Sequence, residues 1–228
     1  MHLQQHPVRY DISFTERPVE TDPFAADTAW SEAGLAHVCR FRPESSDHRP
    51  VTTARLLYDR TALYGLFHVR DRYVRCVRTQ FGEPVYKDSC VEFFVKPAGA
   101  AGYFNFEFNC GGAFLCSYIT DPTRTPDGFA GYVRLTARDV KGVKTCASLP
   151  QRIEPEITTP IEWYLGFYIP LRVLSRFCDC RRPEPDTVWH GNFYKCGDET
   201  SHPHWASWSP VDALNFHLPG CFGELRFR

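Results

Sequence analysis

The sequence predicts an all-β protein, an antiparallel β-sandwich of the jelly-roll or immunoglobulin type with one or two short helices. Two central segments, 91–95 and 103–110, alternate strictly between apolar and other side chains, as strands with one buried face do. Turn-forming residues separate about eleven short segments of this kind, and helical periodicity is rare. No repeat, low-complexity stretch or linker divides the 228 residues. We therefore expect one domain, residues 1–228, with 1–26 as an N-terminal extension.

The N-terminal segment contains little regular structure. Prolines at 7, 18 and 23 interrupt it and leave room for one short strand over residues 8–14. The spacing of Asp27, Trp30 and Ala33 predicts one helical turn. A strand over residues 36–42 is expected to follow.

A β-hairpin is expected next. Residues 54–59 and 62–71 are apolar segments that flank a tight turn at 60–61. One side of the second strand is expected to face the core. That side consists of Leu63, Gly65, Phe67 and Val69.

The C-terminal half continues as short strands between turns rich in Gly, Pro and Asp. The expected strands cover residues 113–119, 132–138, 143–149, 162–170, 188–196 and 221–227. Residues 171–177 are the best helix candidate, because Pro170 ends the preceding strand. Loops are expected over residues 43–50, 72–84, 121–128, 150–160 and 197–220.

The two central strands have an unusual polar face. It carries Glu92, Tyr103, Asn105, Glu107 and Asn109. Solvated strand faces usually carry Lys, Thr and Arg, whereas carboxylates, amides and phenols beside aromatic rings suit a sugar, with its hydroxyls and C–H faces. Asn192 and Tyr194, on the expected strand 188–196, add to this set. The alternative is an ordinary solvated face, with both glutamates paired to Arg or Lys.

Composition excludes several classes of partner. The chain has 26 Lys+Arg against 27 Asp+Glu and no basic run, so neither nucleic acid nor a membrane is an expected partner. No apolar stretch approaches the ~20 residues that span a bilayer. The first residues lack the cationic and apolar regions of a secretory signal. We therefore expect a cytoplasmic location, unless a leader has been removed. The oligomeric state is left open.

Ten cysteines is a high number for this length. No Cys-x-x-Cys occurs, so neither a zinc ribbon nor a thioredoxin-type redox pair is indicated. Several cysteines, such as Cys110 and Cys116, lie within apolar strands, where cysteine behaves as a small hydrophobic residue. With no secretory signal, reduced thiols are expected rather than disulfides.

Two other function classes remain open. Glu92 and Glu107 could act as the acid and base of a glycoside hydrolase. Trp205 and Trp208 could instead mark a protein–protein interaction module, although tryptophans in such loops more often cover a core.

Metal or haem binding is less well supported. His202, His204 and His217 lie in one loop region, but no carboxylate spacing there fits a zinc or calcium motif. A haem-binding sandwich needs an axial Met or His pair, and the sole methionine is Met1.

The order of several motifs resembles the family 9 carbohydrate-binding modules and their DOMON-like relatives. The matching segments are 27–33, 54–71, 86–94, 106–109, 163–170, 207–210, 216–219 and 222–225. None of these motifs identifies the family by itself. Their order and spacing between residues 27 and 228, taken together, do. Segments 191–198 and 216–219 further resemble a standalone bacterial subgroup.

The resemblance implies a sandwich that binds an oligo- or polysaccharide without catalysis and holds a terminal sugar between two aromatic rings. By motif, Tyr86 and Phe216 occupy the two ring positions, Glu92 the carboxylate position and Asn109 the amide position. The expected sugar-binding residues are Tyr86, Glu92, Asn105, Glu107, Asn109, Asn192, Tyr194 and Phe216.

This sequence departs from the family pattern at three points, all of which concern the ligand. Tyr86 and Phe216 replace the two tryptophans that form the family's clamp. Glu107 stands where the family can carry Arg. The acids of the family's calcium loop are not evident, so we expect no cofactor and no metal site, with calcium left open as the family's own ion.

Overall fold

The computed structural model describes residues 7–17, 19–21 and 29–228, and its regular structure is almost entirely β. The strands are β1 (Arg9–Phe14), β2 (Ala36–Val38), β3 (Arg40–Phe41), β4 (Val51–Tyr58), β5 (Ala62–Asp71), β6 (Val74–Cys76), β7 (Cys90–Lys96), β8 (Tyr103–Asn109), β9 (Phe114–Thr125), β10 (Gly128–Arg134), β11 (Lys144–Ala147), β12 (Ile153–Ile157), β13 (Ile161–Pro170), β14 (Val188–Cys196), β15 (Trp205–Ser207) and β16 (Gly223–Phe227). The short helices are α1 (Ala29–Glu32), α2 (Leu171–Leu174) and the 3-10 turns η1 (Val85–Lys87) and η2 (Pro219–Cys221). The all-β prediction is confirmed.

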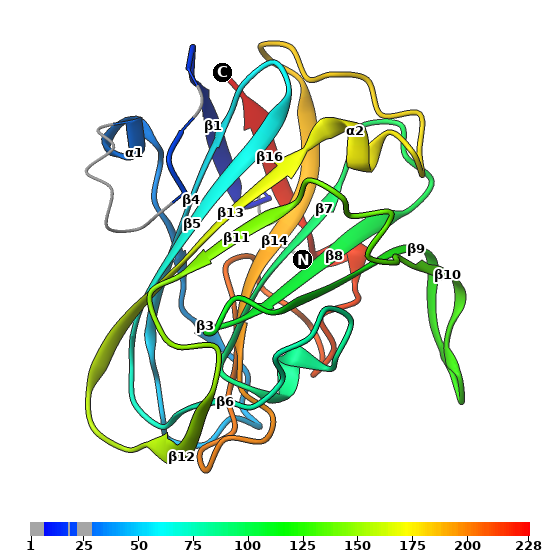
Figure 1. Cartoon of the computed structure of the whole chain (residues 1–228). Helices are drawn as coiled ribbons and strands as arrows, with labels where there is room; N and C mark the ends of the chain where they lie inside the picture. The colour runs from blue at the N-terminus through cyan, green and yellow to red at the C-terminus, as the bar shows by residue number, and fades with distance from the viewer. Residues whose placement is uncertain (1–6, 18, 22–28) are drawn as a thin grey trace, which may run out of the picture.

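The strands form two packed layers that β1 joins (Figure 1). One layer has the order β10, β9, β8, β7, β14, β16 and β1, and the other has the order β1, β4, β5, β13 and β11. The first part of β1 pairs with β16, and its last two residues, Ser13 and Phe14, pair with β4. This arrangement is the expected β-sandwich.

The expectation of purely antiparallel sheets is wrong for β1. This strand is parallel to both β16 and β4, whereas the other named strands pair antiparallel with their neighbours. A tight turn forces two strands to pair antiparallel. No such turn links β1 to β16 or β4, so alternation within residues 8–14 predicts a strand but not its direction.

The core lies between the two layers, where the expected apolar positions meet. The predicted core residues Phe93, Phe104, Phe106, Phe108, Trp163, Phe167 and Phe193 are all fully buried. The rings of Phe108 and Phe167 stack across the layers, with centroids 5.1 Å apart. A Cβ at Gly65 would collide with the Phe167 ring, which shows that Gly65 lies on the same face. The predicted core side of strand 62–71 is thus confirmed.

Four predicted loops contain strands; the fourth, 197–220, holds β15. In two of them, β6 and β12 pair with each other to form a small separate sheet. In the third, β9 continues to Thr125, and the β9–β10 hairpin projects from the body of the molecule (Figure 1). These segments are short or largely exposed, so they lack the apolar alternation that predicts a strand. The helix begins at Leu171 as expected but ends at Leu174, and Asp27 of the first predicted turn lies outside the described residues.

Other parts of the chain cover the outer face of β7, β8 and β14. Phe94, Tyr103 and Tyr194 on this face pack against Val211 and Phe222, which lie in the segment between β15 and β16. A neighbouring apolar cluster consists of Val85, Cys90, Leu115 and Cys196. The polar side chains of this face therefore lie among packed residues rather than in open solvent.

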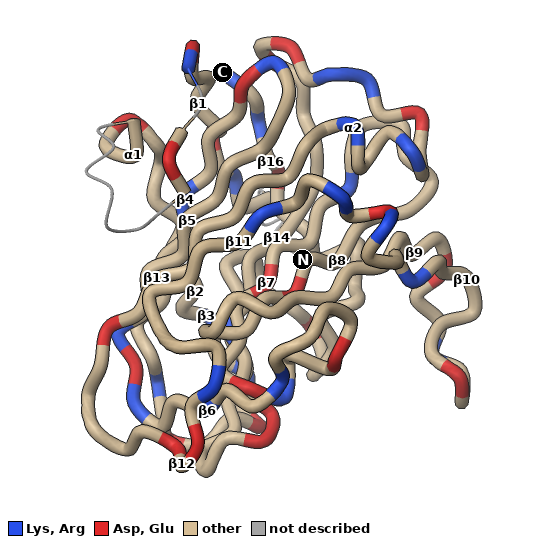
Figure 2. Tube along the Cα trace, in the orientation of Figure 1, with Lys and Arg blue, Asp and Glu red and all other residues tan. Residues whose placement is uncertain are grey.

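Charged positions of both signs are interspersed at the two ends of the sandwich (Figure 2). Several belong to one ion-pair group, in which Arg78 contacts both Asp88, at 3.0 Å, and Glu199, at 2.6 Å. Among the helices of the described residues, none is long and apolar enough to cross a membrane.

Candidate functional site

A cavity of about 800 Å³ opens on the outer face of β7 and β8. Side chains from both strands form its floor, which consists of Glu92, Asn105, Glu107 and Ser117, the last from β9. Rings and charged groups form its walls, among them Tyr86, Arg124, Phe129, Tyr132, Arg134, Asp198, Trp205, Phe216 and His217. A volume of this size accommodates a small ligand.

The ladder between β7 and β8 brings the two glutamates together. Glu92 is directly opposite Glu107 in the antiparallel register, so their side chains leave the sheet on the same face and side by side. Each strand alternates with period two, so Val91 and Phe93 beside Glu92, and the phenylalanines on either side of Glu107, point into the core. Packing of these rings fixes which face the carboxylates occupy.

Glu107 is almost fully buried and only half satisfied. The amide nitrogen of Asn105 donates a hydrogen bond of 2.7 Å to its Oε1, and the Asn105 oxygen accepts one of 2.6 Å from the Ser117 N–H. Oε2 of Glu107 finds no partner among the described residues. Burial raises the pKa of Glu107 to about 7, although the Asn105 hydrogen bond acts in the opposite direction.

Glu92 repeats this arrangement with a thiol as its partner. The Cys196 Sγ donates to Oε1 at 3.2 Å, and Oε2 has no partner within the described part of the chain. The pKa of Glu92 lies well above its usual range, first because of burial and then because of nearby Cys196 and Glu107. Two buried carboxyl oxygens that nothing in the described chain satisfies thus lie at the cavity floor.

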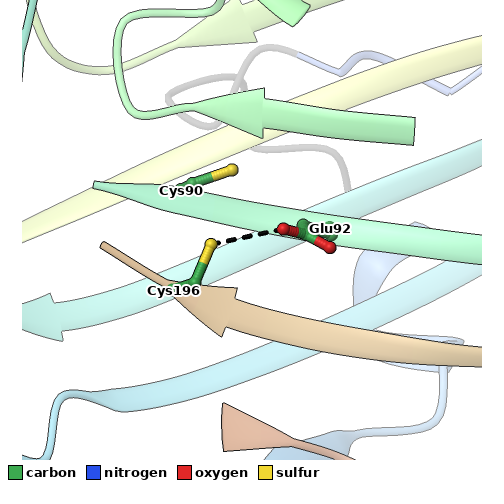
Figure 3. Close-up of side chains that lie close together, drawn as sticks. All are labelled: Cys90, Glu92 and Cys196. Atoms are coloured by element: carbon green, nitrogen blue, oxygen red, sulfur yellow. Dashed lines mark hydrogen bonds between the residues drawn. The ribbon is translucent and has the colours of Figure 1, made fainter. Parts of the chain in front are cut away.

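Cys90 and Cys196 lie next to Glu92 (Figure 3). Cys90 and Glu92 come from β7, and Cys196 lies opposite Cys90 on β14. The ligand atoms of all three lie within 4.8 Å of one another. Two thiols and a carboxylate suit a thiophilic ion such as zinc better than calcium. However, burial raises the pKa of both thiols, to about 12 for Cys90, which keeps them in the protonated form that binds metal poorly.

Tyr86 and Phe216, the two predicted ring positions, both line the cavity and are both partly exposed. Tyr86 lies in η1, before β7, whereas Phe216 lies in the segment before β16. The Phe216 ring stacks on Tyr194 with centroids 4.0 Å apart and planes 13° apart. The Tyr194 hydroxyl also donates to the Phe216 carbonyl at 3.0 Å, so Tyr194 supports this ring from beneath.

Five of the eight predicted site residues line the cavity: Tyr86, Glu92, Asn105, Glu107 and Phe216. Asn109 and Asn192 do not line it, and both are fully buried. The Asn109 amide donates to the carbonyl of Arg78 at 2.7 Å, and that of Asn192 donates to the carbonyl of Ser209 at 3.0 Å. Their oxygens accept backbone N–H groups as well. Both amides hold neighbouring loops in place through hydrogen bonds. Tyr194 is also buried, and its ring packs against that of Phe216.

Sequence reasoning did not identify several residues of the walls. Trp205 donates from its ring nitrogen to Asp198 at 2.7 Å. The ring of His217 hydrogen-bonds to the Tyr103 hydroxyl at 2.9 Å, and burial lowers the pKa of this histidine to about 3, which keeps it neutral. Arg124 lies over the Phe129 ring at 4.3 Å. These residues come from distant loops, and no local pattern predicts that they meet.

The remaining motif residues have structural partners. Trp208 is buried in the core against Tyr10 and Phe193, which does not suit an exposed interaction site. His204 is fully buried and hydrogen-bonds to Lys195 Nζ at 2.7 Å. His202 instead stacks on Tyr73, with centroids 3.6 Å apart. In the described chain the histidines therefore form no grouped metal site with carboxylates.

Comparisons with known proteins agree with the fold. The model of carbohydrate-binding family 9 matches residues 31–227. A crystal structure of a candidate carbohydrate-binding protein from Bacteroides uniformis superposes with a TM-score of 0.82 at 24% identity, covering 97% of this chain and 100% of that one. A family 9 module from Caldicellulosiruptor kristjanssonii, solved with glucose, superposes with a TM-score of 0.58 at 14% identity, covering 97% and 96%. The same module with cellotriose has the same TM-score and identity. No curated protein matches the chain by sequence.

Proposed function

The chain belongs to carbohydrate-binding family 9, and from this membership we propose that the cavity over β7 and β8 binds a sugar without hydrolysing it. The bound unit lies on the carboxyl and amide groups of the floor, between the rings of the walls. The solved relative from Caldicellulosiruptor kristjanssonii holds glucose or cellotriose, and ligands of this size are the first to test.

The pair of unsatisfied carboxyl oxygens carries this proposal. A buried polar atom without a partner costs free energy, and Oε2 of Glu92 and of Glu107 are two such atoms at the floor of one cavity. Sugar hydroxyls would satisfy both. Leaving a buried polar group unsatisfied costs about 1–3 kcal/mol, so satisfying both oxygens would account for much of a sugar's affinity.

The rings of the walls suit the other surface of a sugar. Tyr86, Trp205 and Phe216 line the cavity from three separate segments. Aromatic faces pack against the C–H faces of a pyranose, and the bound ring then lies edge-on to the floor. Because Tyr194 stacks beneath Phe216, this ring is held in place before any ligand binds.

A glycoside hydrolase is the competing function, and the raised pKa of Glu107 is the observation that favours it. General acids of glycosidases have raised pKa values. A second group must then remain ionised to act as the base or nucleophile. The pKa of Glu92 is raised as well, so burial favours the protonated form of both carboxyl groups and holds neither of them ionised as a base or nucleophile. We therefore favour binding without turnover.

A glycan array followed by calorimetry tests the proposal. Glu92→Gln should abolish binding to any glycan that the natural chain binds, whereas Glu162→Gln, at an exposed position of β13 in the other layer, should leave binding unchanged. Incubating each retained glycan with the protein and assaying reducing ends tests for hydrolysis. Release of reducing sugar that Glu92→Gln removes would identify a glycosidase instead.

A further inference from the structure

The cavity floor is acidic, and this feature narrows the class of sugar. We propose that the ligand carries a protonated amino group, as an unsubstituted amino sugar does, and that this group binds between Glu92 and Glu107. The proposal rests on the proposed sugar-binding function of the same cavity. It specifies which substituent the floor recognises.

The first argument is the number of hydrogen-bond donors and acceptors. Glu92 and Glu107 are opposite neighbours in the ladder, and opposite Cβ atoms lie about 4.5–5.5 Å apart. Both unsatisfied atoms thus belong to side chains that leave the sheet side by side on the same face, and the inference places one small group in contact with both. An ammonium group has three donors and no acceptor. A single hydroxyl has one donor and can satisfy only one of these oxygens.

The second argument is charge. Two carboxylates ionised side by side in a buried site repel each other, so beside a neutral ligand the pair favours its protonated form. An ammonium placed between them neutralises one charge and is attracted by both. Asp198, half-buried against Trp205, adds a third carboxyl group to the same cavity.

Other titratable groups around the floor do not supply the missing positive charge. Burial keeps the neighbouring thiols and phenols in their neutral forms by raising their pKa values; these groups are Cys90, Cys196, Tyr86, Tyr103 and Tyr194. His217 is neutral because burial lowers its pKa. Lys195 is bound elsewhere, with its Nζ 3.4 Å from Asp71 Oδ2.

Two arginines line the cavity, and both belong to the exposed β9–β10 hairpin. Arg124 lies over Phe129, and Arg134 donates to the Gly82 carbonyl. Both side chains are exposed, so solvent screens their charges more than those of the buried glutamates. Asp127, on the same hairpin, partly offsets them. The positive groups thus lie toward the mouth and the negative groups at the floor.

Rings of the walls suit the same ligand. Tyr86, Trp205 and Phe216 surround the space above the floor, and aromatic faces attract ammonium groups as well as C–H faces. An amino sugar would therefore use both components of the cavity: its ring would pack between aromatic side chains while its amine contacts the carboxylates.

Three β-1,4-linked oligosaccharides that differ only at C2 provide the test: oligomers of glucosamine, of N-acetylglucosamine and of glucose. Calorimetry at about pH 6, where a sugar amine is protonated, should give an affinity for the glucosamine oligomer roughly tenfold or more above that for the other two. Because Glu107 has a pKa of about 7 in the empty protein, binding the ammonium should also release a proton. Titrations in buffers of different ionisation enthalpy measure this release.

Two variants probe opposite charges. Glu107→Gln should reduce the preference for the amine to about twofold or less, and Arg124→Gln should increase it, because a repelling charge is removed. Glu162→Gln is the control for loss of a carboxylate outside the cavity. Melting temperatures establish that each variant is folded. The comparison of the three oligomers uses the natural chain alone and does not depend on the variants.

The possible outcomes separate this inference from the proposed function. Equal or tighter binding of the glucose oligomer, or binding of the amine without proton release, would overturn the amino-sugar inference and leave sugar binding standing. If none of the three oligomers, nor any glycan on the array, binds the natural chain, the proposed function fails, and this inference fails with it.

Discussion

Glu92 and Glu107 face each other across the β7–β8 ladder, and each has one buried carboxyl oxygen with no partner among the described residues. This relationship decides most of the chemistry of the cavity. Burial and mutual repulsion favour protonated forms while the site is empty. Ligands that donate hydrogen bonds or carry positive charge would favour ionised forms. Binding and protonation should therefore be coupled.

The coupling predicts an unusual dependence of stability on pH. The pKa of Glu107 is about 7 in the folded protein, against the ordinary 4.5 expected of the unfolded chain, so between these values the folded protein holds a proton that the unfolded chain has lost. The free energy of unfolding should therefore fall as pH rises through this window, by an amount of the order of 3 kcal/mol.

Glu107→Gln isolates this effect, because the amide is neutral at every pH. Urea unfolding at about pH 4.5 and about pH 7.5 should show the variant gaining stability relative to the natural chain as pH rises. Glu162→Gln, which is exposed, should follow the natural chain. Parallel profiles for the natural chain and Glu107→Gln would show that Glu107 has an ordinary pKa.

Removing either wall ring should weaken sugar binding. Loss of one aromatic platform costs about 1–3 kcal/mol, so Tyr86→Ala and Phe216→Ala should each lower affinity roughly tenfold to a hundredfold. Tyr164→Ala is the matched control, since Tyr164 is a partly buried ring that stacks on His68 in the other layer. Calorimetry and melting temperatures measure binding and folding. Unchanged affinity in both wall variants would exclude a clamp.

A buried ion pair joins the two layers, and removing either partner should strongly lower the stability of the fold. Lys195 and Asp71 are both completely buried, with Nζ and Oδ2 3.4 Å apart, and they link β14 to β5 across the two layers. Asp71 also accepts from Trp163 at 3.1 Å and contacts His48 at 2.7 Å. Burial alone would raise the pKa of Asp71. The positive charge of Lys195 contributes to the opposite effect, and the pKa lies well below its usual range.

Asp71→Asn leaves Lys195 without a counter-charge and should destabilise the fold by about 3–5 kcal/mol. Lys195→Met should have a similar cost, and the double variant Lys195→Met/Asp71→Leu should recover much of it. Arg9→Met breaks only the exposed pair with Asp11 and should change stability by less than about 1 kcal/mol. Chemical denaturation measures all four. Additive losses in the double variant would mean that the two residues are not coupled.

The thiols should be free and graded in reactivity. Cys39 is exposed, whereas Cys76, Cys90, Cys110, Cys116 and Cys196 are buried. Alkylation of the native protein without reductant should therefore label Cys39 first and leave the five buried thiols unmodified. After denaturation, still without reductant, mass spectrometry should find most of the ten cysteines labelled. Three or more disulfides would contradict this.

Much of the fold follows from short stretches of sequence. Strict alternation in 91–95 and 103–110 determines that Phe93, Phe104 and Phe106 face one way while Glu92 and Glu107 face the other, because side chains alternate along any strand. Burying the phenylalanines is favourable, so the inner face needs no further information. The hairpin of β4 and β5 is local in the same sense, since a tight turn joins its strands.

Only the tertiary structure decides what covers the polar face. Asn109 and Asn192 have the composition of ligand-binding residues, but their amides are used by loop carbonyls that lie close only after folding. Trp205, in the three-residue strand β15, and Phe216, in the irregular segment that follows it, reach the cavity without any periodicity in the sequence that would predict it. Local sequence determines the face on which a side chain lies, whereas long-range packing determines whether that side chain meets the backbone, another side chain or an open cavity. For this reason five of the eight expected residues line the cavity and three do not.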